Sequence, residues 1–297
     1  MLRNYLLLIR LPNTFTVPPD ILVGYFVVGH QDSADALSLP LLIVSSVLLY
    51  ISGIVFNDLF DLEEDKIDSP NRPLPSNKIS VKSASLLAVS TMSSANIIAY
   101  HVSQQSLLVS FVISCTIIAY DYKLKKTKVG FIIMGLARGL NILLGASTAF
   151  FVIPDDPQAL FYTIFITSLM VIYVSSITLL SKGEITGIAN MRKIVAAYGS
   201  VFLIIVLLAI ALFSGIFSFY ASIFLIIFSI GIGINFKKIV TGNYTSLIIQ
   251  KAVKNMIFSI IILDAFFITG NLGIYYGALT ALFVIPSMIL ARNLYVT

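Results

Sequence analysis

Acidic side chains are concentrated in one short stretch of this chain. Six of its fourteen Asp and Glu residues lie in the sequence NDLFDLEEDKID, from Asn57 to Asp68. If a helix continues through this stretch, Asp58, Asp61 and Asp65 are three and four residues apart, so their side chains share one face. Like charges at this spacing repel one another, and the arrangement adds no stability to an isolated helix. A bound cation would reverse that balance.

Magnesium is the cation that suits this donor set. Mg²⁺ is a hard ion that commonly binds one or two carboxylates and completes its octahedron with water and substrate phosphate. We expect Asp58, Asp61 and Asp65 to be the metal ligands, with Asn57 and Asp68 bordering the same face. The ordinary alternative is a solvated acidic loop end that does no chemistry.

The residues that follow favour a phosphate site over a plain acidic loop. The cluster continues into SPNRPLPSNKIS, in which Pro70, Pro73 and Pro75 restrict the backbone around Arg72 and disfavour further helix. A loop restricted in this way can hold Arg72 over a phosphate group.

The complete stretch NDLFDLEEDKIDSPNRPLPSNKIS closely resembles the first aspartate-rich motif of the UbiA superfamily of intramembrane prenyltransferases. That motif is NDxxDxxxD followed by a basic residue and RPLPSGxIS, and this version looks more like the archaeal lipid and chlorophyll-synthase branches than the 4-hydroxybenzoate branch. The resemblance implies a polyprenyl diphosphate donor, a lipophilic or aromatic acceptor and Mg²⁺ as cofactor. It also implies catalytic roles for Asp58, Asp61, Asp65, Arg72 and Lys125.

Further cations are expected on the same side of the membrane. The sequence AYDYKLKKTKVG resembles a second stretch of the family, with Tyr120, Lys125 and Lys126 as the matching residues. Both lysines would neutralise the diphosphate as point charges, although ordinary lysines of a cytoplasmic loop are an alternative. Arg138 and Asn141 lie inside the next apolar run on one helical face. Burying Arg138 there is costly, which favours a polar cavity over snorkelling to the interface.

The second aspartate motif of the family has no full counterpart in this chain. Its usual DxxxD is replaced by SKGEITG, where Glu184 is the single carboxylate and Lys182 lies two residues before it. Both residues remain candidates for substrate binding, and a sub-branch similar to EboC-like members shares this departure. Either Lys182 supplies the charge of a second Mg²⁺, or this branch has lost the ionising chemistry.

The elements that must position these residues are membrane helices. The 297 residues are 58% hydrophobic and 11% charged, with a mean hydropathy of +0.97, which is typical of a chain that lies in a bilayer. We predict nine or ten spans in a UbiA-type all-α bundle around a central cavity. The predicted spans are 15–30, 39–56, 83–100, 105–120, 130–151, 159–180, 194–213, 217–235 and 272–291, with 247–269 as the uncertain tenth.

The distribution of charge predicts one orientation in the membrane. Lys and Arg residues fill the loops after the second, fourth, sixth and eighth spans, and the opposite loops hold Asp and His instead. This bias places the N-terminus and the acidic motif on the cytoplasmic side of a multi-pass protein, most simply in the cell membrane. The pI of about 9.2 follows from these dispersed loop cations, and no nucleic-acid-binding module accompanies it.

These features together predict a single UbiA-like domain over residues 1–297 that works as a Mg²⁺-dependent prenyltransferase. Two alternatives stand beside this function: a catalytically silent protein that binds a prenyl lipid, and a secondary transporter, which would place carboxylates at the membrane midplane. Asp20 and Asp264 are the other acids expected at membrane depth, where either could line the cavity or, for Asp264, lie near the far interface. Cys115 is expected to be buried.

Overall fold

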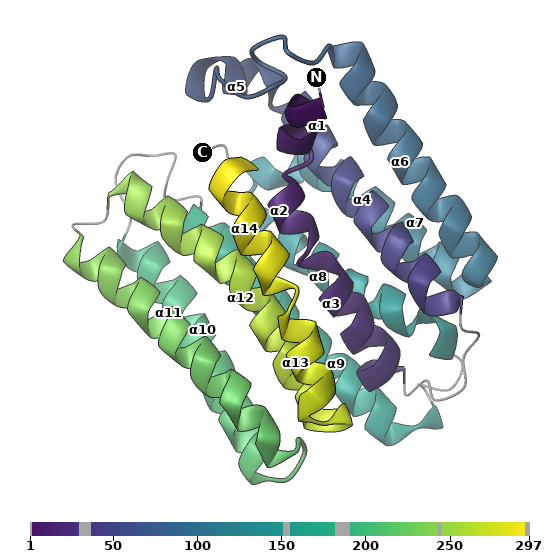
Figure 1. Ribbon diagram of the computed structural model, residues 1–297, viewed down its shortest axis with the longest axis vertical. Helices are drawn as coiled ribbons and strands as arrows, with labels where there is room; N and C mark the ends of the chain where they lie inside the picture. Colours follow the sequence, from purple (N-terminus) through teal and green to yellow (C-terminus); the bar gives the residue numbers. More distant parts are fainter. Residues whose placement is uncertain (1, 30–36, 151–154, 182–190, 243–244, 295–297) are drawn as a thin grey trace.

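The computed structural model describes residues 2–29, 37–150, 155–181, 191–242 and 245–294, and its regular structure in these ranges is helical (Figure 1). In chain order the elements are α1 (Leu2–Leu8), α2 (Leu11–Thr14), α3 (Val17–Leu22), the π-helix η1 (Val23–Val28), α4 (Ser38–Phe60), α5 (Leu62–Asp68), α6 (Val81–Val102), α7 (Gln104–Tyr122), η2 (Leu124–Lys126), α8 (Gly130–Ala146), η3 (Ser147–Ala149), α9 (Pro157–Ser181), α10 (Met191–Phe213), η5 (Phe219–Ala221), α11 (Ser222–Thr241), α12 (Ser246–Leu272), α13 (Ile274–Ala281) and α14 (Val284–Leu294).

Eight helical stretches in the described ranges are long and apolar enough to cross a membrane. The uncertain segment 247–269 forms α12. In its most apolar stretch 67% of the residues are buried, the highest share among the eight helical stretches. Two predicted spans, 15–30 and 83–100, are not among these eight stretches. The segment 15–30 is divided into short helices, and α6 is long enough but is less apolar because serine, threonine and asparagine interrupt its sequence. The all-α membrane fold is confirmed, and the number of predicted spans is close to the observed number.

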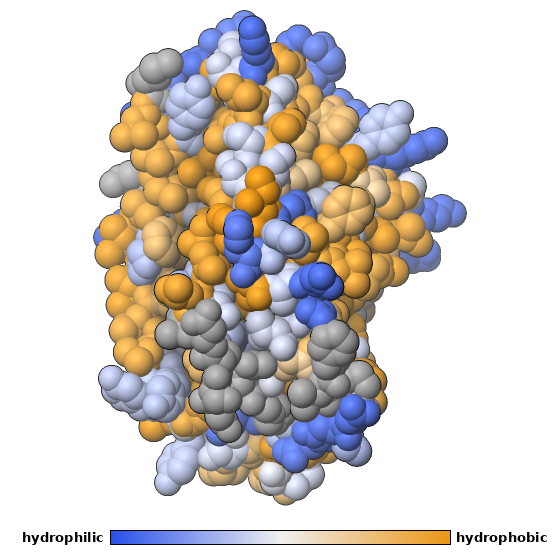
Figure 2. Space-filling model, turned by 90° about the vertical axis from the view of Figure 1, so that its right-hand side faces the viewer, coloured by the Kyte–Doolittle hydropathy of each residue, from blue (hydrophilic) through white to orange (hydrophobic). Residues whose placement is uncertain are grey.

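The surface of the bundle agrees with a lipid environment. Figure 2 shows the side that carries α6, where hydrophobic side chains cover much of the face and hydrophilic ones lie at its upper end, along its right-hand edge, near its middle and at its lower right. Leu86, Val89 and Ile97 of α6 are all more than half exposed, as lipid-facing residues are. Cys115 also lies exposed on α7, so the prediction that it is buried is wrong: an apolar run in a membrane helix has a lipid-facing side as well as a packed side.

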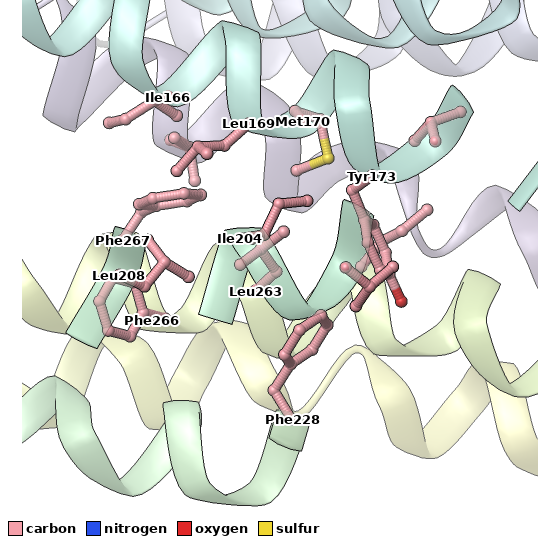
Figure 3. Close-up of a cluster of buried hydrophobic side chains, with 14 of the residues drawn as sticks. Ile166, Leu169, Met170, Tyr173, Ile204, Leu208, Phe228, Leu263, Phe266 and Phe267 are labelled. Carbon is pink, nitrogen blue, oxygen red and sulfur yellow. The ribbon is translucent and has the colours of Figure 1, made fainter. Parts of the chain in front are cut away.

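The largest buried cluster lies in the second half of the chain, among α8 to α12. Figure 3 shows Phe266 and Phe267 of α12 packed beside Leu208 and Ile166, and Phe228 beside Tyr173. The rings of Tyr173 and Phe228 are 5.3 Å apart between centroids. Such close packing holds membrane helices together, because lipid tails are as apolar as the side chains and supply no hydrophobic driving force.

A close helix contact holds the first segment of the chain against α8. A Cβ atom at Gly24 would lie 2.9 Å from the Cα of Gly145, and one at Gly145 would lie 2.5 Å from the carbonyl oxygen of Ile21. Only glycine allows the two backbones to approach so closely. This contact fixes the position of α3 and η1 relative to α8.

Candidate active site

The acidic motif lies where α4 ends and α5 begins, at the same end of the bundle as α1 (Figure 1). The expected continuous helix is interrupted at Asp61, whose φ of −93° and ψ of 4° separate α4 from α5. The backbone stays close to helical because Asp61 N donates to Asn57 O at 3.0 Å and Asp65 N donates to Asp61 O at 2.8 Å. Asp58, Asp61 and Asp65 therefore all line one cavity, as their spacing predicted.

Asp58 is the most buried of the three carboxylates, with 3% of its surface exposed. Its Oδ1 accepts a hydrogen bond from Arg10 Nη2 at 2.8 Å, and Arg72 Nη1 lies 4.0 Å from the same oxygen. The sequence did not identify Arg10 as a site residue. Its φ of 47° lies in the left-handed region that costs a non-glycine residue about 1–2 kcal/mol. That conformation separates α1 from α2, at the residue whose side chain reaches Asp58.

Asp61, Glu64 and Asp65 of the motif also each meet a cation. Arg72 Nη1 donates to both oxygens of Asp65, at 2.9 and 2.8 Å, so the proline-rich segment holds Arg72 over a carboxylate. Lys125 Nζ lies 2.5 Å from Asp61 Oδ1. Lys126 donates to Glu64 at the exposed edge.

The pKa values of the motif reflect this pairing. Burial raises the pKa of Asp65 above its usual range, and the Arg72 guanidinium opposes that rise. The hydrogen bond from Lys126 lowers the pKa of Glu64, and Glu64 in turn raises the pKa of Lys126. At the mouth, Asp65 and Glu64 are therefore each paired with a cationic side chain.

The cavity has a volume of about 900 Å³ and extends from this mouth into the bundle. Along α4 its lining runs from Asp61 past Asp58 to Ser46. The twelve residues from Asp58 to Ser46 correspond to about 18 Å of helix. Leu49, Ile113 and Ile117 are among the apolar residues between the two ends. The cavity is therefore polar at the mouth, apolar in the middle and polar again at its inner end.

The remaining predicted residues fall into two groups. Tyr120, Asp68 and Asn57 line the cavity mouth, where Asn57 Nδ2 donates to Asp121 Oδ1 at 2.9 Å. Asp121 is 3% exposed, and sequence analysis missed it, although it lies beside Tyr120 in the same stretch. Lys182 and Glu184 lie outside the described residues.

Arg138 and Asn141 line the inner end of the cavity, as predicted. Arg138 Nε lies 2.6 Å from Asp20 Oδ2, and Asn141 Nδ2 donates to the same oxygen at 2.8 Å. Asp20 is fully buried behind them, and Asp264 is fully buried beside Asp20. Neither acid is among the described residues that line the cavity, and the position of Asp264 relative to the far interface stays a prediction.

The donor chemistry at the mouth fits Mg²⁺, but the ligands are not assembled around a metal position. No group of three or more His, Cys, Asp or Glu side chains in the described ranges is arranged to hold a metal ion. Instead Asp58, Asp61 and Asp65 each face a cation. Release of these cations to a diphosphate would free hard oxygen ligands of the kind that Mg²⁺ prefers.

A bundle of membrane helices around such a cavity defines an intramembrane protein with a mouth suited to a metal-bound polyanion. The sequence profile of the UbiA prenyltransferase family matches residues 18–247, and this chain belongs to that family. The predicted UbiA resemblance is thus confirmed.

Relatives and solved structures agree with this membership. The chain is 29% identical over 151 residues to the digeranylgeranylglyceryl phosphate synthase of Saccharolobus solfataricus, over 50% of this chain and 53% of that protein. It thus spans about half the length of the curated relatives it matches. A UbiA homologue from Aeropyrum pernix aligns over 86% of this chain and 97% of its own, with a TM-score of 0.70 and 14% identity. An Archaeoglobus fulgidus homologue bound to GPP and Mg²⁺ aligns over 97% and 99%, with a TM-score of 0.58 and 17% identity. At these identities the two structures show the fold alone.

Proposed function

We propose that this chain is a Mg²⁺-dependent intramembrane prenyltransferase that moves a polyprenyl group from its diphosphate to a lipophilic acceptor. The observation that carries the proposal is the set of ion pairs at the mouth of an otherwise apolar cavity. The acids Asp58, Asp61 and Asp65 are paired with cations that a diphosphate would attract more strongly. An apolar wall below them is the surface that an isoprenoid chain needs.

The chain's own residues would act on the diphosphate through charge. Mg²⁺, when bound by Asp58, Asp61 and Asp65, would neutralise the diphosphate and make it a better leaving group. Arg72 and Lys125 would move from their carboxylate partners to phosphate oxygens, where they stabilise the charge that grows as the allylic C–O bond breaks. Diphosphate leaves with the bonding electrons, an acceptor nucleophile forms the new bond to the allylic carbon, and the proton that this nucleophile loses would pass to the released diphosphate.

The acceptor is proposed by analogy with the relatives. They are called digeranylgeranylglyceryl phosphate synthases, so lipids built on glyceryl phosphate are the acceptor class to test first. The sequence motif agrees, because it looks more like the archaeal lipid branch than the 4-hydroxybenzoate branch.

A silent prenyl-lipid-binding protein is the second candidate function, and the departure SKGEITG at the second motif favours it. A transporter is supported less well. Asp20 and Asp264 lie at membrane depth, but both are sealed behind Arg138 and Asn141, away from the cavity lining.

Diphosphate release separates these functions. Purified protein in lipid nanodiscs is given radiolabelled geranylgeranyl diphosphate with and without Mg²⁺, together with a panel of acceptors. We expect Mg²⁺-dependent release that falls by about 100-fold or more in Asp58→Asn, since a lost metal contact costs several kcal/mol. Asp155→Asn, an exposed acid outside the motif, is the matched control. Mg²⁺-dependent donor binding without release would favour the silent protein instead.

A further inference from the structure

The cavity contains a buried hydrogen-bond acceptor that the described residues leave unused. Asn13 of α2 lines the cavity and is 7% exposed. Its side-chain Oδ1 is buried and accepts no hydrogen bond from the described part of the chain. Leaving a buried polar atom unpaired costs about 1–3 kcal/mol. A ligand that donates a hydrogen bond at this point would remove that cost.

A hydrogen-bond donor from α8 reaches the backbone three residues after Asn13. Arg138 donates through Nη2 to the carbonyl oxygen of Thr16 and pairs through Nε with Asp20. Its Nη1 makes no hydrogen bond to the residues that the structure describes, and its side chain is 11% exposed, at the cavity. Thr16 Oγ1 donates to the Asn13 carbonyl oxygen at 2.8 Å, so Thr16 connects the two side chains. Asn13 and Arg138 both line this cavity, and each contacts Thr16.

The charges behind Arg138 decide what kind of group fits there. Asp20 and Asp264 are both fully buried and lie side by side, with Arg138 as their cationic neighbour. If both carboxyl groups were ionised, the cluster would carry one uncompensated negative charge, which is costly in a buried site. A proton held by the two carboxyl groups leaves the cluster neutral. A second anion gains little at such a site, whereas a neutral polar group fits it.

We propose that Asn13 Oδ1 and Arg138 Nη1 bind the nucleophilic hydroxyl group of the acceptor, and that Asp20 and Asp264 are positioning residues for Arg138. A hydroxyl group is both a donor and an acceptor, and the two side chains offer its two complements. Any anionic group on the acceptor would then lie toward the cations of the mouth. This inference rests on the proposed function and deepens it, because it selects an alcohol over an aromatic carbon as the nucleophile.

The position suits the reaction. Asn13 follows Arg10 by three residues, which is about 4.5 Å of helix, and Arg10 marks the mouth through its bond to Asp58. A hydroxyl group at Asn13 would lie about one turn below the diphosphate. The reacting carbon of a donor whose diphosphate binds at the mouth would also lie on the inner side of that diphosphate, the side on which Asn13 lies.

The test uses two probes, monohexadecylglycerol as a neutral alcohol and para-hydroxybenzoate as an anionic aromatic acceptor, with radiolabelled geranylgeranyl diphosphate in nanodiscs. Wild type should transfer the prenyl group to the alcohol. Asn13→Leu, of similar volume, should raise the KM of monohexadecylglycerol about tenfold and leave the KM of the donor within about twofold. Asn96→Leu is the matched control, because it makes the same substitution at another helix asparagine. Asn96 is hydrogen-bonded to Ser110 and Ser114 and is not among the residues that line the cavity.

Three outcomes would overturn the inference: transfer to para-hydroxybenzoate alone, diphosphate release without any alcohol product, or an unchanged KM in Asn13→Leu. Absence of Mg²⁺-dependent release would instead refute the proposed function. A second measurement needs no acceptor. Infrared spectra at neutral pH should contain a protonated-carboxyl band that shifts in D₂O and is lost in Asp264→Asn. A wild-type spectrum without that band would refute the neutral cluster and the preference for a hydroxyl group.

Discussion

Magnesium should bind weakly to this protein until a diphosphate is present, because the carboxylates at the mouth are already neutralised. Four of the acids there are each paired with a cation, so Mg²⁺ alone must compete with those cations for its ligands. Pyrophosphate would draw the cations away and expose the carboxylates. The pairs are Arg10–Asp58, Arg72–Asp65, Lys125–Asp61 and Lys126–Glu64. By linkage, each ligand should then strengthen the binding of the other by the same factor.

Lys125→Met tests this coupling, because it should change the affinity for Mg²⁺ and the affinity for pyrophosphate in opposite directions. The Lys125–Asp61 pair has an N–O distance of 2.5 Å, with the side chains 10% and 20% exposed. A close charge pair of this kind couples by about 1.5 kcal/mol or more, and about 1.4 kcal/mol corresponds to a tenfold change in affinity. The substitution frees Asp61, so the affinity for Mg²⁺ alone should rise about tenfold. The same substitution removes a phosphate partner, so the affinity for pyrophosphate in the presence of Mg²⁺ should fall by a similar factor.

Isothermal titration calorimetry of the protein in nanodiscs measures both affinities. Mg²⁺ is titrated with and without saturating pyrophosphate, in wild type, in Lys125→Met and in Lys237→Met. The last variant is the control, since Lys237 is exposed on α11 and outside the cavity lining. An equal Mg²⁺ affinity with and without pyrophosphate would refute the coupling. A loss of both affinities in Lys125→Met would show that Lys125 does not compete with the metal for Asp61.

Three further predictions concern packing, titration and orientation. Gly24→Ala should lower the free energy of unfolding by about 1–3 kcal/mol through overpacking against α8, measured by thermal unfolding, whereas Gly231→Ala, with nothing near its added Cβ, should not destabilise. Burial raises the pKa of Asp65. The affinity for Mg²⁺–pyrophosphate should therefore be full above this raised pKa and should fall, as the pH is lowered, at a higher pH than with an ordinary aspartate. Asp65→Asn should lack this fall in affinity. In a background without the native cysteine, Lys78→Cys should react with an impermeant maleimide from the cytoplasmic side and Ser214→Cys from the opposite side, and the reverse labelling would refute the predicted orientation.

Sequence alone predicted those features that depend on neighbouring residues. Hydropathy over about twenty residues identifies membrane helices whatever their partners are, and it located the helices that the structure contains. The spacing of Asp58, Asp61 and Asp65 was enough to place them at one cavity, even though the helix is interrupted at Asp61. The motif also predicted the chemistry, because hard carboxylate ligands beside a restricted arginine suit a metal-bound phosphate.

Contacts between distant residues were decided by the tertiary structure. Arg10 binds Asp58 across 48 positions of the sequence, and Arg138 reaches the carbonyl oxygen of Thr16 across 122. Which side chains meet in this way depends on the rotation and depth of each helix, and these are set by packing such as the Gly24–Gly145 contact. The sequence by itself therefore determined a membrane bundle with an acidic, phosphate-suited motif. Only the packed helices decided that cations neutralise this motif and that Asn13 and Arg138 line one cavity.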